Sequence, residues 1–141
     1  MEVSNAVLPN EEQVKGFFES SQEEPIYMVN LLKFREQAHY EDGRRSTLSG
    51  KDAYQLYAEE VSRLITEVGG YMAFVGDIGR LMLGEVEDLW DVTAIAVYPS
   101  CTAMLELIQM PEYSKISVHR SAGLAGQLNI EVVNASGQWL E

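Results

Sequence analysis

The sequence predicts an α+β fold in which a four-stranded antiparallel sheet is covered by helices on one face. Three observations lead to this fold class. First, strand-like and helix-like patterns follow a first helix in the order βαββαβ. Second, two strand-like runs, residues 26–34 and 90–98, are apolar on both faces. Third, residues 51–68 carry apolar side chains at the spacing of one face of a long helix. The length of 141 residues fits one domain with one core.

The composition excludes several classes of function. The chain has 22 acidic and 10 basic side chains, a net charge of -12, and such a surface repels phosphate groups, so nucleic acids and anionic lipids are not expected partners. The single cysteine, Cys101, excludes an internal disulfide framework and a cysteine-rich zinc site. No apolar run approaches the roughly 20 residues that span a bilayer. Because the first residues also lack a basic segment followed by an apolar one, we expect a cytoplasmic protein without a membrane partner.

Residues 1–24 are interpreted as an N-terminal helical extension, and residues 25–141 as the main domain. Within the extension, Asn10 is a good N-cap for a helix over residues 11–20, whose first turn is acidic as the helix dipole favours. Val14, Phe17 and Phe18 form a narrow apolar stripe on that helix. The helix is therefore expected to pack on the main domain.

The main domain begins with a strand over residues 26–34 that is apolar on both faces, as in a covered central strand. Residues 35–49 form a long charged insert without a periodic apolar pattern, which indicates a loop, and loops of this length are often functional. Ser49 then caps a helix over residues 51–68, and Gly69-Gly70 ends it.

The second half of the domain is expected to contain the remaining strands and two helices. Its second strand is interpreted as two halves interrupted by Gly76 and Gly79, which suggests a bulge or bend. The expected elements are strand halves at 71–75 and 80–84, a strand at 90–98, helices at 101–109 and 112–122, and a last strand at 127–134.

This order of elements predicts a ferredoxin-like arrangement, because right-handed crossover helices then lie on one side of the antiparallel sheet. The other sheet face is left bare, although the strands at 26–34 and 90–98 carry apolar residues on that face as well. A bare apolar face of this size needs a partner. We therefore expect a homodimer that forms through the open sheet face.

Several short motifs follow one another between residues 28 and 124. The run Met28-Val-Asn-Leu-Leu-Lys-Phe34 resembles the first strand of the DUF1330 family, small bacterial proteins of the dimeric α/β-barrel superfamily. Further matches in register are the Tyr54-x-x-Tyr57 helix with its Gly69-Gly70 end, Trp90-Asp91, Tyr98-Pro99-Ser100, Pro111-Glu112-Tyr113, and Arg120 before Ala122-Gly123-Leu124. The resemblance covers residues 25–133, and the charged insert at 35–49 departs from the family pattern.

The resemblance implies a dimeric α/β barrel with a cavity between sheet and helices, and it does not supply a substrate. Relatives in the superfamily include cofactor-free mono-oxygenases that act on polycyclic phenols, isomerases of the muconolactone type and haem-dependent proteins. A haem-binding relative requires an axial histidine that faces the cavity. The resemblance therefore leaves the reaction open.

Three polar residues are the candidate catalytic residues. Asn30 interrupts an apolar strand face, and it either donates to a substrate carbonyl or bonds a loop backbone. Asp91 either serves as a general base beside Trp90 or pairs with Arg120 or a backbone N–H. Arg120 either holds a substrate carboxylate or complements the dipole at the end of its helix.

Three tyrosines are the candidate substrate-binding residues. Tyr54 and Tyr57 share one side of a helix, and Tyr113 follows Pro111; each ring either fills the core or lines the cavity with its hydroxyl group. His119, next to Arg120, points elsewhere on the helix and is expected at the surface. Neither histidine has a partner at metal-ligand spacing, and no glycine-rich loop opens a helix, so no metal or cofactor is expected.

We therefore expect a small-molecule-binding protein. If it is an enzyme, the resemblance implies a cofactor-independent reaction, of the mono-oxygenase or isomerase type, on a small anionic or aromatic metabolite. The alternative is a non-catalytic dimeric module for ligand binding or stress response. Half of the basic residues lie between Lys33 and Lys51, and if this segment reaches the mouth of the cavity it attracts an anionic ligand, although a solvated loop is the simpler interpretation.

Overall fold

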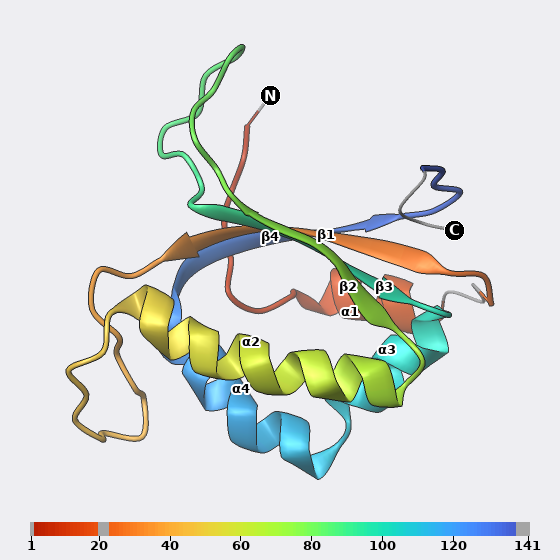
Figure 1. Cartoon of the computed structure of the whole chain (residues 1–141), viewed down its shortest axis with the longest axis horizontal. Coiled ribbons are helices and arrows are strands. Elements are labelled where there is room, and N and C mark those ends of the chain that lie inside the picture. The colour runs from red at the N-terminus through yellow and green to blue at the C-terminus, as the bar shows by residue number, and fades with distance from the viewer. Residues whose placement is uncertain (1, 20–22, 138–141) are drawn as a thin grey trace.

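The computed structural model describes residues 2–19 and 23–137, and it shows a four-stranded antiparallel sheet with helices packed on one face (Figure 1). The strand order is β2-β3-β1-β4, which is the order of a ferredoxin-like sheet, so the predicted α+β class and topology are confirmed. The elements are α1 (Glu11–Glu19), β1 (Ile26–Phe34), α2 (Gly50–Glu67), β2 (Tyr71–Asp77), β3 (Val92–Tyr98), α3 (Cys101–Ile108), α4 (Pro111–Gly123) and β4 (Leu124–Val132).

The central strand β1 pairs with β3 on one side and with β4 on the other, so that Asn30 lies opposite both Ala94 and Asn129. The even-numbered residues of β1 and β3 face the helices, and the main core forms there from residues such as Ile26, Leu64 and Leu107. Side chains alternate between the two faces of a strand, which explains why one face of β1 builds this core.

Helices α2 and α4 lie side by side across the sheet and approach each other at two glycines (Figure 1). A Cβ atom on Gly123 would lie against the carbonyl oxygen of Gly50 and 2.9 Å from the backbone nitrogen of Tyr54. The two backbones can meet only because both positions lack a side chain. This contact sets the position of α4 and therefore of Arg120, which lies on its last turn.

The segment between β2 and β3 differs from the prediction. Residues 80–84 form no strand, and residues 78–91 make a long excursion that is closed at its base by a hydrogen bond from Ile78 N to Asp91 O (2.9 Å). The consecutive apolar residues Leu81, Met82 and Leu83 have no partner strand among the described residues, and Met82 is 99% exposed. The strand irregularity lies between Met72 and Phe74, not at the later glycines.

The charged insert is packed on the helices. Tyr40 is buried, His39 N donates to Ala122 O (3.0 Å), and Ala38 N donates to Leu48 O (3.0 Å). Arg44 lies over the Tyr40 ring and pairs with Asp42. Insert residues therefore hold the end of α4 against the start of α2.

The N-terminal residues pass the free edge of β4 before they reach α1. Ala6 N donates to Gln127 O (3.3 Å), and the indole N–H of Trp90 donates to Asn5 Oδ1 (2.6 Å). Helix α1 then lies beside α3 on the helical side of the sheet, as Figure 1 shows. The predicted helix at 11–20 is thus found, and its expected last residue, 20, lies outside the described residues.

The second face of the sheet carries no helix among the described elements (Figure 1). By register, its side chains come from the odd-numbered residues of β1 and β3 and from their partners on β2 and β4. They are almost all apolar: Tyr27, Val29, Leu31, Tyr71, Phe74, Ile95, Val97, Leu128, Ile130 and Val132. None of the described helices is long and apolar enough to cross a membrane.

Candidate functional site

A cavity of about 620 Å³ lies between the sheet and helices α2, α3 and α4. Its floor includes Ala94 and Ala96 of β3, whose small side chains leave space beneath the helices. Five of the six candidate residues line this central cavity: Asn30, Tyr54, Tyr57, Tyr113 and Arg120. The fold therefore brings together residues that are as much as 90 positions apart in the sequence.

A chain of hydrogen bonds runs from α4 to the central strand along the floor of the cavity. Arg120 Nη2 donates to Gln127 Oε1 (2.7 Å), and Gln127 Nε2 donates to Asn30 Oδ1 (2.6 Å). Asn30 Nδ2 in turn donates to the carbonyl oxygens of Met28 (3.1 Å) and Ala94 (3.4 Å). Because a guanidinium group can only donate, it fixes which way the Gln127 amide points, and Gln127 does the same for Asn30.

The chain of bonds changes the role that we assign to Asn30. Its amide hydrogens are directed to backbone carbonyl groups and its oxygen accepts from Gln127. The backbone interaction considered from the sequence is therefore present, although the carbonyl groups belong to strands and not to a loop. The hydrogen bond between the two amides holds the Asn30 and Gln127 side chains against each other.

Arg120 is a half-buried cation that faces the cavity. Its side chain forms no ion pair with the described residues, and its one side-chain hydrogen bond among them is to the neutral amide of Gln127. A guanidinium group has five donor hydrogens in a planar fork, which suits a bidentate carboxylate. Arg120 therefore retains donors for an anionic group in the cavity.

The tyrosines form a cluster on the helical wall. The ring centroids of Tyr54 and Tyr57 are 5.2 Å apart, and the Tyr57 and Tyr113 hydroxyl oxygens are 3.3 Å apart. Burial raises the pKa of Tyr54 to about 12 and the pKa of Tyr57 well above its ordinary value, whereas the charge of Arg120 acts in the opposite direction. The Tyr54 and Tyr57 hydroxyl groups therefore stay protonated at neutral pH, where they can donate hydrogen bonds and cannot act as bases.

Asp91 does not line the cavity. Its carboxylate accepts from the backbone N–H of Phe34 (2.9 Å) and lies 3.4 Å from Lys33 Nζ. The pairing of Asp91 with a backbone N–H, one of the alternatives from the sequence, is present. Arg120, the other suggested partner, bonds Gln127 instead. Asp91 fastens the start of β3 to the end of β1, and we leave it out of the proposed site.

His119 is half-buried, so the expectation of a surface histidine is wrong. Its Nδ1 lies 2.7 Å from the Tyr40 hydroxyl oxygen, because the insert folds over this side of α4. Burial, and then the charge of Arg44, lower the pKa of His119 below 6.5, with Asp42 acting in the opposite direction. Neither His119 nor His39 is among the described residues that line the central cavity.

We predict that this contact makes stability depend on pH. Since folding lowers the pKa of His119, its contribution is complete above the unfolded pKa of about 6.5 and is lost as the pH falls towards the folded pKa. Urea unfolding at about pH 7.5 and about pH 5.5 should show a larger loss for the wild type than for His119→Gln. An equal loss in both proteins would contradict this role.

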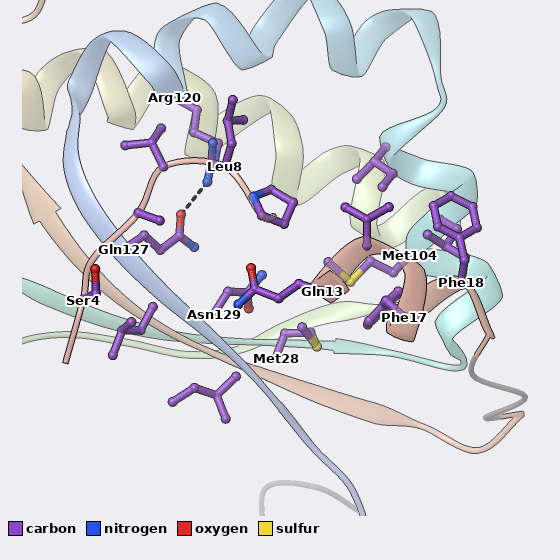
Figure 2. A pocket seen from close by; sticks show the side chains of 18 residues that line it. Ser4, Leu8, Gln13, Phe17, Phe18, Met28, Met104, Arg120, Gln127 and Asn129 are labelled. Carbon is purple, nitrogen blue, oxygen red and sulfur yellow. Dashed lines mark hydrogen bonds between the residues drawn. The ribbon is translucent and has the colours of Figure 1, made fainter. Parts of the chain in front are cut away.

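Gln127 and the N-terminal segment were missed in the sequence. Gln127 is buried with 8% exposure. The sequence signal that could have found it is the alternation of two amides, Gln127 and Asn129, with the apolar residues of the last strand. Val7, Leu8 and Pro9 lie over the cavity, although they are distant in sequence from every other lining element. Figure 2 shows Leu8 beside Arg120, and Arg120 pointing toward Gln127.

A second hollow of about 480 Å³, the β4-edge groove, lies between β4, α1 and α3 (Figure 2). Arg120, Gln127 and Val7–Pro9 line both hollows. The described residues contain no cluster of three metal-ligand side chains. The site is therefore a two-part hollow with a single arginine at the junction.

The chain is similar to RPA0582 of Rhodopseudomonas palustris, a protein of unknown function. The identity is 28% and the TM-score 0.85, over 95% of this chain and 100% of that chain. For the structure of methylated RPA0582 the identity is 29% and the TM-score 0.86, over 96% of this chain and 99% of that chain. Because the part outside the alignment is much shorter than residues 1–24, the likeness extends into the N-terminal extension.

More distant likenesses concern the fold alone. The hydroxynitrile lyase of Passiflora edulis has 12% identity and a TM-score of 0.53, over 82% of this chain and 98% of that chain. The protein At3g17210 of Arabidopsis thaliana has 15% identity and a TM-score of 0.51, over 80% of this chain and 98% of that chain. No family model and no curated protein matches the chain. The comparisons thus establish a shared fold with proteins of unknown function and with one lyase.

Proposed function

We propose that the protein binds a small organic carboxylate in the central cavity. The observation that carries this proposal is Arg120, a half-buried cation that faces the cavity and has no ion pair among the described residues. A chain with a net charge of -12 repels anions in general. An anion therefore binds where a cation is screened from the acidic surface, and Arg120 meets that condition.

The lining favours binding over proton abstraction. The cavity-lining carboxylate among the described residues is Asp77, which is exposed at the mouth and 3.7 Å from Lys51 Nζ. The hydroxyl groups of Tyr54 and Tyr57 are protonated. A ligand-binding module thus fits the lining best.

The second candidate function is catalytic, and the Tyr57–Tyr113 hydroxyl pair is the observation that favours it. Together with Arg120, these donors would stabilise an oxyanion that develops on a bound carbonyl group. A cofactor-independent enzyme of the mono-oxygenase or isomerase type would use them in this way, with a proton acceptor supplied by the substrate.

Calorimetric titration with benzoate, and with benzyl alcohol as the neutral control, tests the binding function. A planar carboxylate suits both the guanidinium group and the aromatic wall. We expect one benzoate per chain and weaker binding of benzyl alcohol. Equal affinity for the two compounds, or no heat with either, would contradict the proposal.

We also propose that two copies associate through the open sheet face, and that the chain is a member of the DUF1330 family. Two features support the dimer: the apolar face itself, and the excursion at residues 78–91, which extends on the same side of the sheet in Figure 1 and carries the exposed residues Leu81, Met82 and Leu83. The first-strand motif over residues 28–34 and the agreement in topology support the family.

Ile95 lies near the middle of the open face, so Ile95→Glu should convert the dimer to a folded monomer. A carboxylate buried between two apolar sheets has no partner, which makes association unfavourable. Sedimentation velocity measures the change, and circular dichroism checks folding. Thr102→Glu, at an exposed position of α3, is the matched control. A wild type that sediments as a 15.8 kDa monomer would disprove the dimer.

A further inference from the structure

We propose that the ligand is an amphipathic carboxylate, whose head binds Arg120 and whose unbranched apolar tail lies in the β4-edge groove. This inference rests on the proposed function, because it takes the carboxylate site at Arg120 as its starting point. It goes further by naming the chemical class of the ligand and by assigning the second hollow to its tail.

The position of Arg120 is the first argument. Arg120 and Gln127 line both the central cavity and the groove. Figure 2 shows the arginine descending from α4 toward Gln127, with Leu8 beside it. If the guanidinium group holds the ligand's carboxylate at this junction, the rest of the ligand can enter the groove directly.

The distribution of charge is the second argument. Among the described residues that line the groove, Arg120 is the only ionisable one. The wall beyond it is formed by Phe17 and Phe18 of α1, Met28 of β1, and Met104 of α3 (Figure 2). One cation at one end of an apolar channel matches one carboxylate at one end of an apolar chain.

The exposed apolar surface of the groove is the third argument. Leu8 is 72% exposed and Phe18 is 52% exposed, and α1 contains no fully buried residue. A tail in the groove would remove this surface from water, which is favourable in proportion to the area covered. Methionine and leucine side chains adapt their shape to a flexible chain more readily than a rigid wall would.

The test is a calorimetric series with butanoate, hexanoate, octanoate and decanoate, kept below their micelle concentrations. If each added methylene is buried, the affinity rises by about fourfold per methylene over the range that the groove accommodates. The alcohol of the same length should bind more weakly at every step. The expected stoichiometry is one molecule per chain.

Val14 lines the groove but not the central cavity, so Val14→Trp should fill the groove. The expected result is that the dependence on chain length disappears while benzoate still binds. Lys15→Trp is the matched control, because Lys15 is a solvent-exposed neighbour on the same helix. Circular dichroism of both variants verifies that they fold.

The possible failures are distinguishable. Benzoate binding without a gain for longer alkanoates would overturn the inference and leave the proposed function intact. Absence of binding by benzoate and by every alkanoate would overturn both. If Val14→Trp leaves the chain-length dependence unchanged, or changes the oligomeric state instead, the tail does not lie in the groove and the inference is wrong.

Discussion

Arg120→Gln should weaken benzoate binding by about 10- to 150-fold, because a hydrogen bond to a charged group contributes about 1.5–3 kcal/mol. Glutamine retains a donor for Gln127, so the variant should fold, yet it offers no positive charge to the ligand. The benzoate affinity of Arg120→Lys should lie between those of the wild type and Arg120→Gln, since an ammonium group keeps the charge and loses the bidentate geometry. Calorimetric titration of the three proteins measures the effect.

Arg63→Gln is the control for a general loss of positive charge. Arg63 lies on the outer side of α2 and pairs with Glu60 and Glu67. Its removal should leave benzoate affinity unchanged, because exposed pairs of this kind contribute little and lie outside the cavity. If Arg120→Gln binds benzoate as well as wild type does, the carboxylate site is not at Arg120.

Gly123→Ala should destabilise the fold by about 3 kcal/mol or more, at the upper end of what overpacking costs. The added methyl group would lie against the carbonyl oxygen of Gly50 and 2.9 Å from the backbone nitrogen of Tyr54. Both neighbours are backbone atoms, so no side-chain rotation can relieve the contact, and α4 must move away from α2. Urea unfolding followed by circular dichroism measures the loss.

Gly79→Ala is the matched control for that substitution. Gly79 lies in the excursion between β2 and β3, where a Cβ atom would have nothing within 4 Å, and its backbone conformation is not left-handed. The unfolding midpoint should stay within experimental error of the wild type. A Gly123→Ala protein as stable as Gly79→Ala would show that the contact between the helices is not as close as described.

The sequence correctly predicted those helices and strands whose local residue patterns agree with the contacts that they make in the folded chain. The strand at 26–34 and the helix start at Ser49 were correct because a short apolar run and a capping serine are local signals. The strand half at 80–84 was wrong because its apolar run, Leu81 to Leu83, lies in an excursion that pairs with none of the described strands. Pairing is decided by distant residues, and the local pattern carries no information about it.

The site could be predicted only in part, for a similar reason. Asn30 and Arg120 were identified as polar exceptions in apolar or helical surroundings, and the structure places both at the cavity. Gln127 joins them through register, since β4 lies beside β1 only in the folded sheet. Asp91 was selected for its neighbour Trp90, but strand pairing directs its carboxylate to the end of β1.

The most direct test of the carboxylate site is a proton–nitrogen correlation spectrum of the labelled protein, recorded while benzoate is added. We expect the Nε–H signal of Arg120 and the side-chain amide signals of Gln127 to shift together and to saturate at one benzoate per chain. Arg63 should not shift. If benzoate binds while the Arg120 and Gln127 signals stay in place, the ligand lies elsewhere and the central claim is wrong.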